Sequence, residues 1–262
     1  MKQEIKNAIL GKRFWGACAL MMVCLLGLSV PEWISSISWG SEYRQSALQQ
    51  SISGAFFGGV MLLLPFCACL PYAVNQVDEL CSSVANWKLI RSSTKKYAMN
   101  KIIAAGMSGG ASIILAFILH SVVWNIIALP CDPGMYPYHQ ISFHPDSLYA
   151  IWYQIMYGLP MYLSIATGMF ISGFVWAVVA LSVSVWVPDR LLTITIPTCI
   201  YYLISANILQ PILGWQLPHP ATLYNDALTV ESALESIFEY FIIFTLASII
   251  YMHGLKRREQ DA

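Results

Sequence analysis

Residues 70–101 read LPYAVNQVDELCSSVANWKLIRSSTKKYAMNK, and this interval decides how the chain is organised. It is the only long polar stretch that also carries a run of basic residues. Apolar segments too long for ordinary core helices lie on both sides of it. The basic residues are Lys88, Arg91, Lys95, Lys96 and Lys101. The interval therefore indicates one surface of a membrane, with a spanning segment before it and another after it.

The interval itself predicts two helices separated by a break. An amphipathic helix is expected over residues 74–91, with acidic residues towards its beginning and basic residues towards its end, as the helix dipole favours. Hydroxyl N-caps at 92–94 then predict a second helix from Lys95. The first helix either lies on the lipid headgroups or docks a soluble partner. Its apolar stripe is Val77, Leu80, Val84 and Trp87.

The composition of the whole chain is that of an integral membrane protein. Of its 262 residues, 57% are hydrophobic and only 11% are charged, and the mean hydropathy is +0.60. A soluble domain carries about 25% charged residues, so this chain lacks the polar surface that water would require. The net charge of zero gives no indication of nucleic-acid binding. The seven cysteines lie mostly within apolar segments, which implies no disulfide framework.

We expect a single transmembrane domain over 1–262, because each bilayer crossing needs about 20 apolar residues. Residues 1–13 form a basic amphipathic lead-in suited to the inner leaflet. The stretch 147–187 is too long for one span and is broken at Gly158-Leu159-Pro160, so 147–157 is predicted as an external interfacial helix. The six predicted spans are 14–30, 53–73, 102–129, 160–187, 191–209 and 236–252.

The distribution of basic residues orients these spans. With both termini inside the cell, every basic residue except Arg44 lies on the cytoplasmic side. Splitting 147–187 into two full spans would instead place the basic residues 256–258 outside. The fold class is therefore predicted to be an all-α, multi-pass membrane protein with six transmembrane helices, N-in and C-in.

Several polar residues in the outer halves of the spans are candidates for a substrate pathway. An acidic series, Glu231, Glu235 and Glu239, recurs every four residues, where like charges repel unless something offsets them. A cationic substrate is one partner for this series, and an ordinary solvated helix end is the alternative. Polar residues within spans either line a pathway or join neighbouring helices by hydrogen bonds. The pathway candidates are Glu235, Glu239, His120, Asn125 and Asn207.

Two further patterns suggest other chemistry. Residues 106–109 have the G-x-S-G form of intramembrane serine proteases, with His253 as a partner for Ser108, although small residues also allow close helix packing. The external loop holds Cys131, Asp132, His139 and His144, whose spacing matches no familiar metal site, and we predict no metal. The chain has no P-loop motif, so we expect no ATP hydrolysis in this chain.

The central interval resembles a known family. Leu64-Pro65 and Leu70-Pro71-Tyr72 are followed by Asp78-Glu79, then by Arg91-Ser92, and then by Lys95-Lys96-Tyr97 through to Lys101. This order is similar to that of the six-helix permease subunits of bacterial ABC-2 type exporters. The N-terminal MKQEIKNAILGKRF is similar to the connecting helix of that family. The specific part of the match covers about residues 1–30 and 64–101. Ser83 stands where the family often has glycine.

This resemblance implies a transport subunit rather than an enzyme. Residues 74–91 would be the coupling helix, which docks on a separate ATP-binding subunit that binds ATP and Mg²⁺. Two ATP-binding subunits, a second identical or paralogous permease chain and membrane lipid would be the partners, in the bacterial plasma membrane. Peptides, drugs or lipids would be the exported substrates. The residues expected to contact the partner are Asp78, Glu79, Leu80, Val84, Trp87 and Arg91.

Two other classes of protein remain open at this point. One is an intramembrane serine protease that uses Ser108 and His253. The other is a non-enzymatic membrane scaffold or sensor, in which the basic interval binds lipid or another protein.

Overall fold

The structure is a computed structural model, and it describes residues 2–38, 47–48, 50–51, 59–82, 93–128, 159–205 and 230–261. Within these ranges the chain is almost entirely helical and contains no strand, which confirms the predicted all-α class. The helices are α1 (Lys2–Leu10), α2 (Lys12–Ser38), α4 (Gly59–Cys69), α5 (Ala73–Cys81), α7 (Thr94–Ile127), α9 (Leu159–Trp186), α10 (Arg190–Ser205) and α12 (Val230–Asp261).

Four of these helices are long and apolar enough to cross a membrane: α2, α7, α9 and α12. Helix α10 is apolar but shorter. The membrane class of the protein is thereby supported by structure as well as by composition. The spans predicted at 53–73 and 191–209 stay predictions, and so does the count of six.

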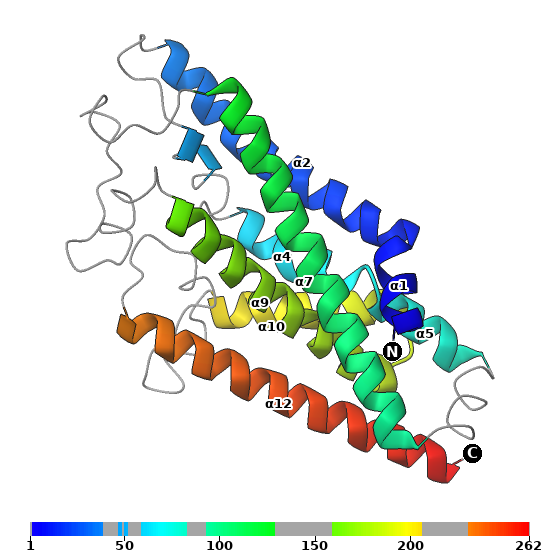
Figure 1. Cartoon of the computed structure of the whole chain (residues 1–262). Helices are drawn as coiled ribbons and strands as arrows, with labels where there is room; N and C mark the ends of the chain where they lie inside the picture. The colour runs from blue at the N-terminus through cyan, green and yellow to red at the C-terminus, as the bar shows by residue number, and fades with distance from the viewer. Residues whose placement is uncertain are drawn as a thin grey trace.

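Helix α9 forms the centre of the bundle. It packs against α4, α5, α7, α10 and α12, and most of its side chains are buried. Helix α12 lies at the periphery, and its exposed residues include Phe238 and Phe241, which suit contact with lipid. In Figure 1 both termini lie at the same end of the bundle, together with α1, α5 and the beginning of α7. The side of a membrane on which the two termini lie stays a prediction.

The tightest helix contact joins α7 to α9 through glycines. A Cβ atom added at Gly109 would lie 2.5 Å from the Cβ of Ala177 and 2.8 Å from the carbonyl oxygens of Ala68 and Gly173. A Cβ atom added at Gly106 would lie equally close to the ring of Phe174. The small residues of the G-x-S-G stretch therefore allow the two backbones to approach each other, as small residues do between membrane helices.

Two helix boundaries differ from the predicted spans. Helix α7 begins at Thr94, where the Ser93 side chain accepts a hydrogen bond from the Lys96 backbone N–H, so the predicted hydroxyl cap is confirmed. At 1.5 Å per residue its 34 residues reach about 51 Å, more than the hydrocarbon thickness of about 30 Å. Helix α2 continues through Pro31 to Ser38. Membrane helices tolerate such a proline because other groups satisfy the freed carbonyl.

Several predicted features lie outside the described residues. They are the second half of the predicted coupling helix with Val84, Trp87 and Arg91, the interfacial helix at 147–157, Asn207, and the external loop with Cys131, Asp132, His139 and His144.

Candidate functional site

Helix α5 is the element from which the site is built. It follows α4 after a turn at Leu70-Pro71-Tyr72, and it packs against α9 and α10. Its apolar face is buried through Ala73, Val74 and Val77. The remaining faces carry two polar pairs spaced three residues apart, Asn75 with Asp78 and Gln76 with Glu79. At this spacing each pair shares one side of the helix, so α5 presents two polar rows to different neighbours.

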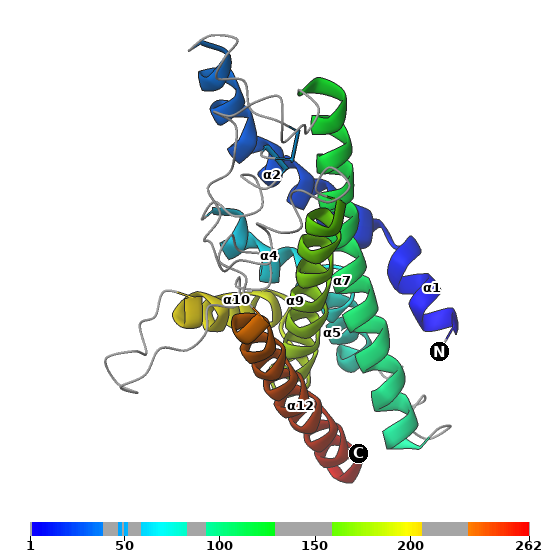
Figure 2. The same ribbon diagram turned by 60° about the vertical axis from the view of Figure 1, so that its left-hand side comes forward.

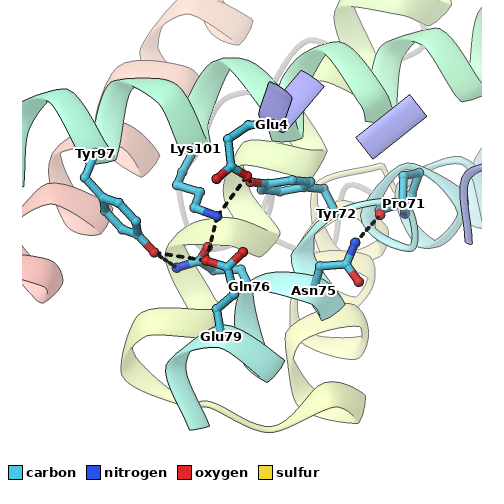
Figure 3. Close-up of polar contacts among 8 residues, drawn as sticks. All are labelled: Glu4, Pro71, Tyr72, Asn75, Gln76, Glu79, Tyr97 and Lys101. Atoms are coloured by element: carbon cyan, nitrogen blue, oxygen red, sulfur yellow. Dashed lines mark hydrogen bonds and ion pairs between the residues drawn. The ribbon is translucent and has the colours of Figure 1, made fainter. Parts of the chain in front are cut away.

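The first row meets a buried lysine from α7. The ammonium of Lys101 lies 2.7 Å from a carboxylate oxygen of Glu79 and 3.2 Å from one of Glu4 on α1. The Lys101 side chain is only 1% exposed. Figure 3 shows the two carboxylates on either side of the ammonium, one from α1 and one from α5. One cation thus joins three helices that are far apart in sequence.

Neutral groups complete this cluster. The Tyr72 hydroxyl donates to Glu4 over 2.7 Å, and the Gln76 amide donates to the Tyr97 hydroxyl over 3.2 Å. The Tyr97 hydroxyl lies 3.4 Å from Glu79. The Lys101 ammonium also lies 5.2 Å and 5.4 Å from the ring centroids of Tyr72 and Tyr97, within cation–π range. Because a buried charge is tolerated only with such compensation, the cluster fixes the orientation of α5.

The second row meets two arginines. Asp78 lies 3.1 Å from Arg13 at the beginning of α2 and 2.7 Å from Arg190 at the beginning of α10. Arg13 also donates to Asn75. Partial burial acts to raise the pKa of Asp78, but the hydrogen bonds and charges of the two arginines outweigh it and lower that pKa below its ordinary value of 3.8. Asp78 is therefore held as a carboxylate that links α5 to α2 and α10.

The ion pairs also offset an unfavourable interaction between the two carboxylates of α5 and the dipole of that helix. The sequence predicted that Asp78 and Glu79 lie near the beginning of this helix. Because α5 begins at Ala73, they lie in its second half instead. Carboxylates near the C-terminal end of a helix interact unfavourably with its dipole. The three basic partners from α2, α7 and α10 offset this effect.

Of the predicted partner contacts, three are described. Asp78 and Glu79 make the ion pairs above, and Leu80 is half-buried against the main core. Among residues 73–82, which are α5 and the residue after it, Cys81 and Ser82 are the exposed ones. These positions, rather than the acidic residues, are open to another chain.

Sequence reasoning did not single out Glu4, Arg13, Lys101 or Arg190 as site residues. One signal was present: Lys101 lies two turns inside a long apolar helix, where an ionisable group is costly unless it is paired. Glu4 also lies one turn before Ala8, which is buried, and therefore on the inward face of α1.

Two of the predicted pathway residues, His120 and Asn125 on α7, have hydrogen-bond partners within the chain. His120 is buried, and its Nε2 accepts a hydrogen bond from Trp124 over 2.9 Å and lies 3.0 Å from the Ser29 hydroxyl of α2. Asn125 donates to the Ser121 carbonyl and to the Tyr162 hydroxyl. These two residues join helices, as the alternative interpretation of polar residues within spans expected.

The two described side chains of the acidic series on α12 differ in their exposure. Glu235 is exposed. Glu239 is half-exposed, and one of its carboxylate oxygens is buried without a hydrogen-bond partner. Glu239 therefore remains a candidate for contact with substrate.

The two residues of the protease hypothesis have other partners. The Ser108 hydroxyl is buried and donates to the Ala105 carbonyl over 3.0 Å. His253 is exposed and stacks on Trp186 with 6.0 Å between ring centroids. Neither the hydroxyl nor the imidazole is thus arranged for nucleophilic attack, which would need a hydrogen bond between them.

Among the described residues, no group of three or more His, Cys, Asp or Glu side chains is placed to hold a metal ion. Comparison of the chain with models of known protein families, with curated proteins and with solved structures gives no match.

Proposed function

We propose that this chain is the membrane-spanning permease subunit of a bacterial ABC-2 type exporter, and that α5 is the beginning of the coupling helix predicted over residues 74–91. In this proposal a separate subunit binds and hydrolyses ATP, and a second permease chain completes the pathway. The observation that carries the proposal is the double attachment of α5: Glu79 pairs with Lys101 on α7, which also pairs with Glu4 on α1, and Asp78 pairs with arginines on α2 and α10.

A coupling helix must transmit a displacement from a partner to the membrane helices without absorbing it. A helix attached only by its chain ends would tilt when pushed. Ion pairs attach α5 to α2, α7 and α10, Lys101 extends the attachment to α1, and α9 contacts α5, so a displacement of α5 moves this end of the bundle with it. This is the mechanical property that ATP-driven transport requires and that a lipid-binding loop does not.

In this proposal, two roles are divided along this short helix. Asp78 and Glu79 orient α5, since both carboxylates are engaged within the chain. Contact with the ATP-binding subunit falls to the exposed end at Cys81 and Ser82 and to the residues that follow. Charge reversal at Glu79 would therefore disturb the fold first, and a test of docking has to use the exposed end.

The test is site-specific photocrosslinking in the native host membrane. A photoreactive amino acid replaces Ser82, which is exposed, and a matched control variant carries it at Leu234, which is 63% exposed at the opposite end of the bundle. We expect position 82 to crosslink to a chain with a Walker-type ATP-binding motif, identified by mass spectrometry, and position 234 not to do so.

The proposal fails if position 82 gives no such crosslink while the variant is folded and inserted in the membrane. It also fails if no ATP-binding chain co-purifies with the gently solubilised wild type. A crosslink to lipid alone at position 82 would favour the scaffold or sensor class.

A further inference from the structure

A pocket of about 280 Å³ lies between the beginning of α7 and the end of α12. Figures 1 and 2 show these two helix ends side by side, at the end of the bundle that holds the termini. The hydroxyl of Thr94 donates to Glu259 over 2.6 Å and ties the two ends together. The pocket is lined by Thr94, Lys95, Ile249, Met252, His253 and Lys256.

The rim of the pocket is basic. Lys95 and Lys256 are both exposed, and within the described part of the chain neither has an ion-pair partner. His253 stacks on Trp186, and the guanidinium of Arg257 lies 5.8 Å from the same ring. The nearby carboxylate, Glu259, already accepts the Thr94 hydrogen bond. Unpaired lysines from two helices around one pocket attract an anion, and the N-terminal end of α7 adds to that attraction.

The inner wall of the pocket is apolar. Ile249 is 53% exposed although it belongs to a membrane-spanning helix, and Met252 beside it packs against the main core. Basic and apolar residues thus follow each other along α12 within two turns. This order matches an amphiphile whose charged group lies at the membrane surface and whose chain lies in the hydrocarbon.

We propose that this pocket binds an anionic phospholipid, with the phosphate between Lys95 and Lys256 and the acyl region against Ile249 and Met252. The lipid would bridge α7 and α12 at the inner surface of the membrane. The inference depends on the membrane location of the chain and does not require the proposed transport function. A soluble phosphate shares the charge of the lipid headgroup but gains nothing from the apolar wall, which allows the two to be distinguished.

The test is native mass spectrometry of the purified full-length protein after delipidation and addition of defined lipids. Phosphatidylglycerol is titrated against wild type, Lys95→Gln/Lys256→Gln and Ile249→Ser, and phosphatidylcholine serves as the zwitterionic comparison. The control variant Lys6→Gln/Lys12→Gln removes two exposed lysines from the same end of the bundle. Since each lysine near a surface contributes about 1 kcal/mol, we expect the paired pocket substitution to weaken phosphatidylglycerol binding by about 10- to 30-fold.

Retention of phosphatidylglycerol by the wild type and by the Lys6→Gln/Lys12→Gln control, with loss in both pocket variants, supports the site. Inorganic phosphate added in excess should not displace the lipid. Three results would overturn the proposal: equal binding by the pocket variant, equal binding of phosphatidylcholine, or displacement by phosphate alone. A protein dimer whose formation depends on Lys95 and Lys256 would also overturn it, because a second copy would then occupy the pocket.

Discussion

The ammonium of Lys101 lies 2.7 Å from the carboxylate of Glu79, although Lys101 belongs to a membrane-spanning helix and Glu79 to the short helix before it. A buried ion pair of this kind adds little net stability compared with apolar packing, but loss of one partner is costly. Its value is therefore orientation. The pair sets the position of α5 against α7, and Glu4 extends the same constraint to α1.

Replacement of Lys101 by methionine should destabilise the protein more than any other single change in this region. It would leave Glu4 and Glu79 close together without a cation, at a cost of about 3 kcal/mol, the lower end for a broken buried pair because both carboxylates keep some exposure to water. Thermal unfolding of the purified protein in detergent measures this change as a lower midpoint.

The matched control neutralises the whole cluster. In Lys101→Met/Glu4→Gln/Glu79→Gln no charge is left unpaired, so we expect recovery of more than half of the lost stability. A single Lys101→Met variant as stable as wild type would show that the ammonium is not a structural contact.

Asp78 should make stability depend on pH in the acid range. Because its pKa is lowered in the folded protein, the carboxylate contributes stability above its ordinary value of 3.8, and that contribution is lost as the pH falls through the lowered pKa. Wild type should therefore unfold at a higher temperature than Asp78→Asn at pH 7, and the difference should shrink below pH 3.8. The other carboxylates titrate in both proteins, so their contributions cancel in the difference between the two unfolding temperatures. A difference that stayed constant from pH 7 to pH 3 would contradict the assignment of the arginine contacts.

The sequence was sufficient for the elements that depend on neighbouring residues. Apolar segments of spanning length predicted the helical membrane class, and the hydroxyl before Lys95 predicted the cap at Ser93. Both signals are local, because helix length and capping depend on residues within one or two turns.

The site itself depends on contacts that no local pattern contains. Its ion pairs join residues that are 97, 65 and 112 positions apart in the chain. The expectation that Asp78 and Glu79 contact a partner came from the resemblance to a permease family, and that resemblance carries no information on contacts within this chain. The fold instead brings Arg13, Lys101 and Arg190 to them, and the position of Lys101 inside a long apolar helix is the one sequence signal that such partners are needed.

Gly109 should not accept even a methyl group. In Gly109→Ala the new Cβ would meet the Cβ of Ala177 and two backbone oxygens, and backbone atoms cannot move aside as a flexible side chain can. We expect a loss of about 1–3 kcal/mol, as for other overpacked positions. Gly16→Ala is the matched control, because no atom beyond its chain neighbours and the nearby backbone of its own helix lies within 4 Å of the added Cβ, and alanine favours the helix by up to about 1 kcal/mol. Equal midpoints for the two variants in detergent unfolding would refute the close approach of α7 and α9.

The contact of His120 with Ser29 should contribute to helix association rather than to transport. Trp124 donates to the His120 Nε2 and lies 3.2 Å from the Ser29 hydroxyl, so the three groups form one buried cluster between α2 and α7. A double-mutant cycle of Ser29→Ala with His120→Leu, measured by unfolding, should give a coupling free energy of about 0.6 kcal/mol, as is usual for such hydrogen bonds in membranes. The control cycle pairs Ser29→Ala with Ser172→Ala, since Ser172 accepts instead from Tyr240 on α12, and we expect these two changes to be additive. If the two substitutions proved additive and His120→Leu left the fold and stability as in wild type, this contact would not contribute to helix association, and His120 would remain a candidate for the proposed substrate pathway.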